Sequence, residues 1–279
     1  MKPATVELNL ASPQVMAIVN VTPDSFYAGS RNRTTEAIER RVLEAVGEGA
    51  SILDVGGYSS RPGAAEVPVE EEWARVKAGV GAVRRLAPAA VVSVDTFRSE
   101  VARRVLEEFG PVIINDISAG ELDPPMLDVV ARQGIPYVAM HMKGDPQTMQ
   151  SLTEYRRDIT TEVVSYFRAR VERLLAAGIR REQIILDPGF GFAKTVDQNY
   201  ELLSGLHRLC DLGFPVLAGL SRKSMIYKPL GITPEESLAG TVALGWECLR
   251  QGARILRVHD VREAADTVRL FRIYEQNRH

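Results

Sequence analysis

Eight short apolar runs, spread over the 279 residues, constrain the fold more than any other feature of this sequence. The runs are rich in valine and isoleucine, and apolar and polar residues do not alternate within them. This pattern is typical of parallel β-strands that are buried on both faces. The runs are Val15–Val19, Ile52–Leu53, Val91–Val94, Val112–Ile114, Tyr137–Met140, Ile184–Leu186, Pro215–Leu220 and Ile255–Val258.

Helical patterns lie between these runs. From Asp158 to Ala177 apolar residues recur at helical spacing, and Gly178 follows as a stop signal. A further helix is predicted from Thr233 to about Gly252, and the last helix is predicted to begin at Asp260. The apolar stripe of the first of these helices consists of Val163, Val164, Phe167, Val171, Leu174 and Leu175.

The alternation of strand and helix predicts an α/β protein with a (β/α)8 TIM-barrel fold. The length of 279 residues suits one such barrel, and no low-complexity stretch divides the chain. We therefore expect one domain over residues 1–279. In such a barrel the loops that follow the carboxyl ends of the strands form the active site.

Composition excludes several classes of partner. The formal net charge of −2 gives no general attraction to nucleic acid or to anionic membranes, and no apolar run has the length of a membrane span. Residues 1–13 contain no apolar stretch of signal-peptide length, so a cytoplasmic protein is expected. Small molecules are the expected partners.

Polar residues follow several of the predicted strands. Asp95, Asn115 and Asp187 stand at strand ends, and Lys223 follows the seventh run. Taken alone, Asp95 reads as a helix cap and Asn115 as a turn residue. Barrel closure would instead bring all four to one rim, where they would suit a flat heterocycle rich in nitrogen or stabilise a cationic intermediate.

Asn20, Arg257 and His259 form a second group, because the first and last strands become neighbours on closure. Arg257 and His259 are separated by one residue, so their side chains point to the same side. Together with the Asn20 carboxamide they suggest a phosphate pocket with room for a hard metal ion. The alternative is a surface pair in which Arg257 and His259 accompany Asp260.

Loops and turns on the same rim suggest further binding elements. Three long connections, at 22–35, 58–69 and 143–155, each follow a strand, and arginines in the first two suit a flap that closes on an anion. The two phenylalanines of the Asp187–Phe192 turn are expected to be exposed and to wall a slot for an aromatic ring. Ser221–Ser224 either receives a carboxylate at a helix start or is a plain cap.

The strand-end segments resemble those of the dihydropteroate synthases, the folate-pathway family that sulfonamides block. The matching segments follow every predicted strand in the order found in that family. They are Asn20–Phe26, Asp54–Gly57, Ser60–Gly63, Ser93–Thr96, Ile114–Ile117, Met140–Met142, Asp187–Phe192, Ser221–Ser224 and Arg257–Asp260.

The resemblance implies an enzyme that condenses 6-hydroxymethyl-7,8-dihydropterin pyrophosphate with 4-aminobenzoate, through a dihydropterin cation, to give dihydropteroate and pyrophosphate. By the same resemblance, the pterin would be held by Asp95, Asn115, Met140, Asp187 and Lys223. Pyrophosphate would be held by Asn20, Arg257 and His259, with Mg²⁺ on Asn20. The aminobenzoate slot would consist of Phe26, Ser60, Arg61, Pro62, Phe192 and Ser221. The catalytic residues would be Asp95, Asp187, Lys223 and Arg61.

Two other functions remain open for the same fold. A pterin-binding domain that passes a methyl group from methyltetrahydrofolate to a corrinoid would share the Asp and Asn strand ends, but it would not need a pyrophosphate pocket. A pterin-binding paralogue without catalytic activity would keep the fold and lose catalytic residues. The resemblance also implies a homodimer formed through helices near the carboxyl end.

Overall fold

The computed structural model describes residues 6–21, 31–59 and 66–278, with the side chains of α1 described from residue 35 onward. Within these ranges eight strands form a single parallel sheet. The strands are β1 (Gln14–Asn20), β2 (Ile52–Gly56), β3 (Val91–Asp95), β4 (Ile113–Asp116), β5 (Tyr137–Met140), β6 (Ile184–Asp187), β7 (Leu217–Ala218) and β8 (Ile255–Val258).

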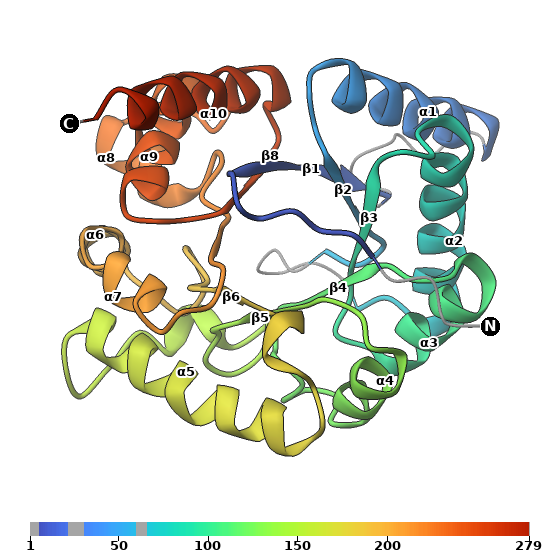
Figure 1. The fold of residues 1–279 in the computed structure, drawn as a ribbon, viewed down its shortest axis with the longest axis horizontal. Coiled ribbons are helices and arrows are strands. Elements are labelled where there is room, and N and C mark those ends of the chain that lie inside the picture. Colours follow the sequence, from blue (N-terminus) through green and yellow to red (C-terminus); the bar gives the residue numbers. More distant parts are fainter. Residues whose placement is uncertain (1–5, 22–30, 60–65, 279) are drawn as a thin grey trace.

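Helices surround the sheet and alternate with its strands along the chain, as Figure 1 shows. Short helical turns at Met149–Ser151 and Arg181–Gln183 precede α5 and β6. The α-helices are α1 (Arg31–Gly47), α2 (Val69–Leu86), α3 (Ser99–Phe109), α4 (Pro125–Gln133), α5 (Ile159–Ala176), α6 (Val196–Ser204), α7 (His207–Cys210), α8 (Ser224–Leu230), α9 (Leu238–Arg250) and α10 (Val261–Gln276).

The sheet curls into a nearly closed barrel. Its strand order is β6-β5-β4-β3-β2-β1-β8-β7, and a bridge between Leu186 and Val216 joins the two ends. The backbone N–H of Leu186 also donates to the carbonyl oxygen of Pro215 at 2.9 Å. The predicted (β/α)8 barrel is therefore confirmed, although the seventh strand is shorter than the Pro215–Leu220 run suggested.

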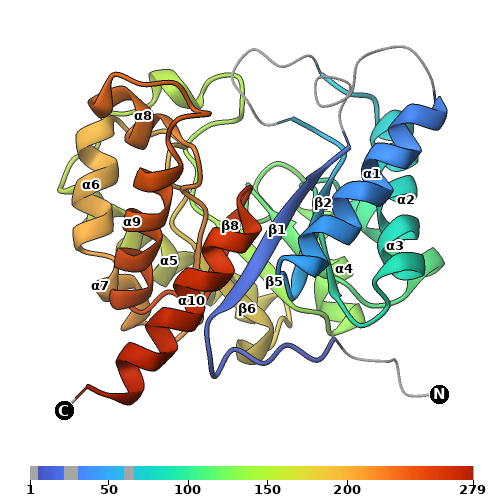
Figure 2. The ribbon, with the colours of Figure 1, turned by 90° about the horizontal axis from the view of Figure 1, so that it is seen from above.

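Alternate strand residues face the inside of the barrel, because side chains on a strand alternate between its two faces. The lowest inward layer is apolar and forms the floor of the barrel. It consists of Met16, Ile52, Ile113, Val138, Ile185, Leu217 and Ile255. Val6, Leu8 and Leu10, in the segment that precedes β1, pack against this floor and cover the amino-terminal end of the barrel (Figure 2).

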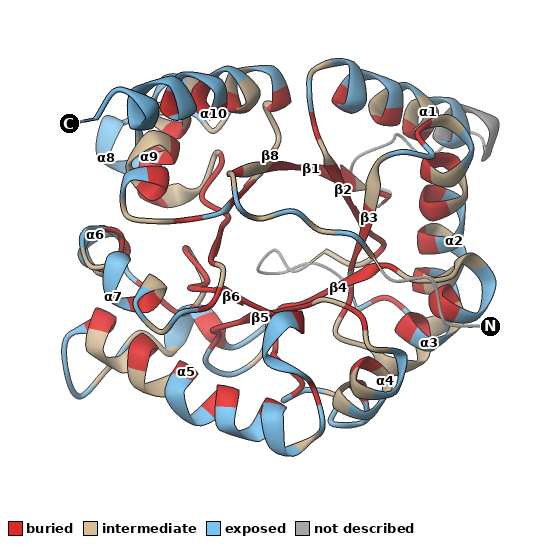
Figure 3. Cartoon of the chain, in the orientation of Figure 1, coloured by how far each residue is buried: buried red, intermediate tan, exposed pale blue. Residues whose placement is uncertain are grey.

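The outward strand residues pack against the buried faces of the helices, and the outer faces of the helices remain exposed (Figure 3). Helix α5 begins after its cap Asp158, close to the predicted range of Asp158 to Ala177, and buries most of the expected stripe. Leu175 is the exception, with 42% of its surface exposed. Helix α9 begins only at Leu238, because Thr233 and Glu236 form a separate turn closed by a Thr233 N–H bond to the Glu236 carboxylate at 2.9 Å.

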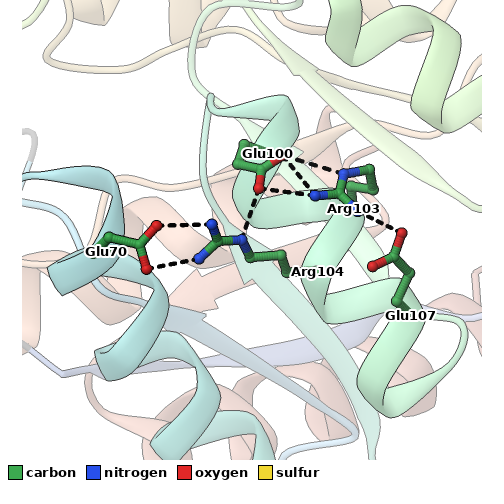
Figure 4. Close-up of polar contacts among 5 residues, drawn as sticks. All are labelled: Glu70, Glu100, Arg103, Arg104 and Glu107. Atoms are coloured by element: carbon green, nitrogen blue, oxygen red, sulfur yellow. Dashed lines mark hydrogen bonds and ion pairs between the residues drawn. The ribbon is translucent and has the colours of Figure 1, made fainter.

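Ion pairs join α2 to α3 on the outer surface (Figure 4). Arg104 of α3 binds Glu70 of α2 through two parallel hydrogen bonds of 2.7 and 2.8 Å, and its Nε also binds Glu100 at 2.7 Å. Arg103 continues the network to Glu100 and Glu107. These side chains are exposed or half-buried, so water and salt weaken the pairs.

Two glycines of α2 provide a test of this packing. A Cβ at Gly79 would stand 2.5 Å from Val55 Cγ1 on β2, whereas a Cβ at Gly81 would meet only the Phe109 ring, at 3.8 Å. We expect Gly79→Ala to lower the free energy of unfolding by about 1–3 kcal/mol through overpacking. The control Gly81→Ala should raise it by roughly 0.5–1 kcal/mol through helix propensity. Urea denaturation measures both, and equal stabilities would contradict the packing described here.

Candidate active site

A polar layer lies directly above the apolar floor of the barrel. Two residues further along each strand, the inward position lies closer to the carboxyl end, and this position carries charged or polar side chains on five strands. These are Asp54 on β2, Ser93 on β3, Asn115 on β4, Asp187 on β6 and Arg257 on β8. The inward residues thus change from apolar to polar within two positions along the strand. This change places a set of charges at the carboxyl-end mouth, as barrel geometry predicted.

Arg257 connects three strands across this mouth. Its Nε donates to Asp54 Oδ2 and its Nη2 donates to Asp95 Oδ2, each at 2.6 Å. Asn115 completes the chain by donating from Nδ2 to Asp54 Oδ2 at 3.0 Å. Arg257 of the expected phosphate pocket is therefore bonded to Asp95, and through Asp54 it is linked to Asn115, two of the residues expected to hold the pterin.

The electrostatics of this cluster follow from burial and close charges. Burial raises the pKa of Asp95 from 3.8 to about 7, with Arg257 opposing the rise and Asp54 adding to it. Burial lowers the pKa of Arg257, but Asp54 and Asp95 outweigh it, so the guanidinium remains charged. Asp54 and Asp95 would repel each other without a cation between them, and the Arg257 guanidinium allows the two carboxylates to stay close together.

Gly56 leaves space between Asn20 and Asp95. A Cβ at Gly56 would lie 3.5 Å from Asp95 Cβ and 3.6 Å from Asn20 Oδ1. Register pairs Gly56 with Asn20 on one side and with Asp95 on the other. The absence of a side chain there opens a gap at the rim, with an amide oxygen and a carboxylate on its two sides.

Lys223 approaches the same mouth from the turn before α8. Its Nζ donates to the carbonyl oxygen of Phe190 at 2.6 Å and lies 4.7 Å from the centre of the Phe192 ring. Burial lowers the pKa of Lys223 to about 8, and Asp187 acts in the opposite direction. Burial likewise raises the pKa of Asp187, while Lys223 and the Gly189 N–H lower it. Asp187 and Lys223 are therefore close enough to stabilise each other's charged form.

The two phenylalanines of the Asp187–Phe192 turn have different surroundings. Phe192 is half-buried and packs on an apolar cluster that includes Met140 and Met142. Phe190 is fully buried in the core outside the strands, so the expectation that both rings are exposed was wrong. Only Phe192 can form part of a slot at the mouth, beside Met140.

The Ser221–Lys223 segment divides its side chains between the site and the scaffold. Ser221 Oγ lies 3.1 Å from His259 Nδ1 and accepts the His259 backbone N–H at 3.2 Å. Arg222, at a left-handed φ of 55°, binds Asp260 through two hydrogen bonds of 2.9 and 2.6 Å. Asp260 therefore pairs with Arg222 and not with Arg257 or His259, contrary to the surface-pair alternative.

The structure places the predicted residues on β1, on β3 to β8 and in the turns after these strands around one mouth. Four predicted residues lie outside the described residues: Phe26, Ser60, Arg61 and Pro62. Asp54 received no binding role from the sequence, although its position two residues after Ile52 signals that it faces inward.

Among residues 6–21, 31–59 and 66–278, no three His, Cys, Asp or Glu side chains are grouped to hold a metal ion. Over the same ranges, no helix is long and apolar enough to cross a membrane.

Comparison with known proteins gives consistent matches. The family model described as "Pterin binding enzyme" matches residues 16–259. The dihydropteroate synthase of Escherichia coli K12 is 44% identical over 94% of this chain and 92% of its own length, and that of Haemophilus influenzae is 39% identical over 95% and 94%.

Solved structures match to the same extent. A Xanthomonas albilineans dihydropteroate synthase with 4-aminobenzoic acid superposes with a TM-score of 0.88 at 42% identity, covering 96% of this chain and 95% of that one. The same enzyme in complex with 7,8-dihydropteroate gives a TM-score of 0.84 at 40% identity, with the same coverage. The fold and its polar mouth are those of a pterin-binding barrel enzyme. Within that class, this chain belongs to the dihydropteroate synthase family.

Removing the Arg257 guanidinium tests the charge cluster. Arg257→Met leaves Asp54 and Asp95 side by side, so we expect a loss of about 3–5 kcal/mol in the free energy of unfolding at about pH 8.5. The loss should be smaller at about pH 6, because Asp95, with a pKa near 7, then holds a proton in both proteins and the repulsion is relieved. Urea denaturation at the two pH values measures this difference.

Arg272→Met is the matched control. Arg272 donates from Nη2 to the Pro13 carbonyl and binds no carboxylate in the described part of the chain. Its replacement should cost the same at both pH values. A pH-independent loss for Arg257→Met would contradict the proposed repulsion.

Proposed function

We propose that the protein condenses 6-hydroxymethyl-7,8-dihydropterin pyrophosphate with 4-aminobenzoate to form 7,8-dihydropteroate and pyrophosphate. The observation that carries this proposal is the ring of three carboxylates, two cations and a carboxamide at the barrel mouth. The 44% identity to a dihydropteroate synthase over most of both chains supports the same reaction. The enzyme is accordingly a transferase.

The charges suit a reaction in which bond cleavage precedes attack. The C–O bond to pyrophosphate breaks, its electron pair leaves with the oxygen, and the carbon becomes a cation that the dihydropterin ring delocalises. Asp95 and Asp187 lower the energy of that cation electrostatically. The arylamine nitrogen then forms the new C–N bond and loses a proton, and no strong base is required.

Each substrate has a proposed place around the mouth. The pterin lies among Asp95, Asn115, Met140, Asp187 and Lys223, with Asp54 holding Asn115 and Arg257. Pyrophosphate lies toward Asn20, Arg257 and His259. The 4-aminobenzoate ring lies along Phe192 and near Ser221, with Phe26, Ser60, Arg61 and Pro62 from the two loops. We propose that sulfonamides compete for this last place, which inhibition kinetics against 4-aminobenzoate would test.

We propose that Mg²⁺ accompanies the pyrophosphate. Asn20 Oδ1 lies at the gap above Gly56 and is a hard oxygen donor of the kind this ion accepts. One protein oxygen fits an ion that takes its other ligands from phosphate oxygens and water. Bound there, the ion would neutralise charge on the leaving group. Asn20→Ala should raise the Mg²⁺ concentration needed for half-maximal binding of pyrophosphate, as calorimetry can measure.

Turnover separates this function from its alternatives. The synthase consumes both substrates and releases pyrophosphate in a one-to-one ratio with dihydropteroate. A methyltransferase-type domain would instead demethylate methyltetrahydrofolate with a corrinoid, and an inactive paralogue would bind pterin without turnover. Failure to release pyrophosphate from the two substrates with Mg²⁺ present would refute the proposed function.

Asp95 provides a test of the electrostatic step. Asp95→Asn keeps the shape of the side chain and removes its negative charge, so we expect pyrophosphate release to slow by roughly 10- to 100-fold. Single-turnover mixing with the pterin pyrophosphate and 4-aminobenzoate measures this rate. The control Asp197→Asn, exposed on α6, should react at the wild-type rate. An unchanged rate for Asp95→Asn would remove its proposed role.

We propose that the protein forms a homodimer through α10. Leu270, Ile273 and Tyr274 on this helix expose 60%, 50% and 47% of their surfaces, which is a large apolar area to leave in water. Ile273→Glu should therefore shift the protein to a monomer in sedimentation-velocity experiments. Leu175→Glu is the control, because exposed Leu175 belongs to α5, which lies across the barrel from α10 (Figure 1). This substitution should leave the dimer intact. A dimer that persists in Ile273→Glu would contradict this interface.

A further inference from the structure

Lys194 is a buried ammonium next to the proposed substrate site. Only 5% of its surface is exposed, and Nζ donates to the carbonyl oxygens of Gly189 and Phe192, each at 2.9 Å. His141 Nδ1 lies 3.0 Å from the same nitrogen. An ammonium has three N–H donors and no acceptor, so Lys194 donates to Nδ1 of a neutral His141 ring. All three donors of Lys194 are therefore used.

Lys194 lacks the partner that a buried cation usually has. Among the described residues, no carboxylate lies within ion-pair distance of its Nζ, although Asp187 is close enough to favour its charged form. Burial lowers the pKa of Lys194 to about 7, and burial also holds the pKa of His141 well below its ordinary value. An apolar side chain of the same length would avoid this desolvation cost, but it could not bind two carbonyl oxygens at once.

The two carbonyls lie at the ends of one turn. Gly189 follows the strand that carries Asp187, and Phe192 is the residue whose ring lies under Lys223. The Phe190 carbonyl between them accepts from Lys223 at 2.6 Å. The backbone N–H of Phe192 also donates to the Gly189 carbonyl oxygen, at 3.0 Å. Lys194 therefore adds a second link between the two ends of the turn from which Phe192 projects and to which Lys223 is bound.

We propose that Lys194 is a positioning residue, whose ammonium holds the ends of the Gly189–Phe192 turn together and thereby places the Phe192 ring against 4-aminobenzoate. The inference rests on the proposed function, because it assigns this ring to the aminobenzoate side of the site. Lys194 itself touches neither substrate.

The pterin side of the turn is held independently of Lys194. Asp187 belongs to β6, its carbonyl oxygen accepts the His141 N–H at 2.9 Å, and its Oδ1 accepts the Gly189 N–H at 2.8 Å. Gly189 has a φ of 67°, and a Cβ there would lie 2.1 Å from the His141 carbonyl oxygen. After loss of the Lys194 ammonium, the Phe192 end keeps its N–H bond to Gly189 but loses the donor to its carbonyl oxygen, whereas the Asp187 end keeps all of these bonds. The Phe192 end should therefore loosen more than the Asp187 end.

Replacement by methionine tests the inference. Lys194→Met keeps the length of the side chain and removes the three donors, so we expect the KM for 4-aminobenzoate to rise by roughly tenfold or more. The Kd of the pterin pyrophosphate, measured by calorimetry with Mg²⁺, should stay within about twofold of wild type. Steady-state kinetics with each substrate varied in turn gives the first value, and thermal unfolding confirms that the variant is folded.

Tyr155→Phe is the matched control. The Tyr155 hydroxyl donates to the carbonyl oxygen of Ala193 at 2.9 Å, one residue beyond the span that Lys194 closes. Its loss removes a hydrogen bond from the same segment without freeing either end of the turn. Both substrates should therefore be used within about twofold of the wild-type KM.

The outcomes separate this inference from the proposed function. If the wild-type protein turns over and Lys194→Met has an unchanged KM for 4-aminobenzoate, or loses both substrates equally, the positioning role is wrong and the proposed function stands. If the wild-type protein does not turn over, both are wrong. Should the methionine variant fail to fold, Lys194→Leu also lacks the N–H donors in a shorter side chain; an increase in the KM for 4-aminobenzoate alone would support the role, and no change would overturn it.

Discussion

The ion pairs of Arg257 with Asp54 and Asp95 are the interaction on which the active-site mouth depends. Without the guanidinium, two carboxylates on neighbouring strands would face each other in a place where burial already raises the pKa of one of them. With it, the carboxylates remain close enough to act together on a positive charge. Because Arg257 lies on β8 and its partners on β2 and β3, the cluster forms only when the last strand pairs with β1.

Much of the fold could be predicted from the sequence, because parallel strands buried on both faces leave a local pattern. The eight apolar runs correspond to the eight strands of the described chain, and α5 nearly fills the range predicted from Asp158 to Ala177. The sequence-based prediction of the fold is wrong where one local sequence pattern is compatible with two structures. The Thr233–Glu236 pattern is the same for a helix start and for an isolated turn, and only packing decides that α9 begins at Leu238.

The candidate site was predictable in position but not in its internal pairing. Alternation along a strand indicates that Arg257 faces inward, but not that its guanidinium reaches Asp54 and Asp95 on other strands. Phe190 and Phe192 look equivalent in the sequence, yet one enters the core and the other the mouth, because the turn reverses direction between them. Such distinctions depend on contacts far apart in the chain, and composition does not encode them.

The turn after β6 shows how two lysines with similar surroundings can serve different purposes. Both are placed where burial lowers the pKa, and both donate to carbonyl oxygens of the same turn. Among the described residues, Lys223 donates one hydrogen bond to the turn, and its Nζ lies beside the Phe192 ring. Because Lys223 is only half-buried, its ammonium can reorient toward a substrate. Lys194 is almost fully buried and has all three donors engaged, so its charge acts on the backbone of the turn. A polar residue at an active site therefore has to be judged by its unused hydrogen-bonding capacity as well as by its distance from the chemistry.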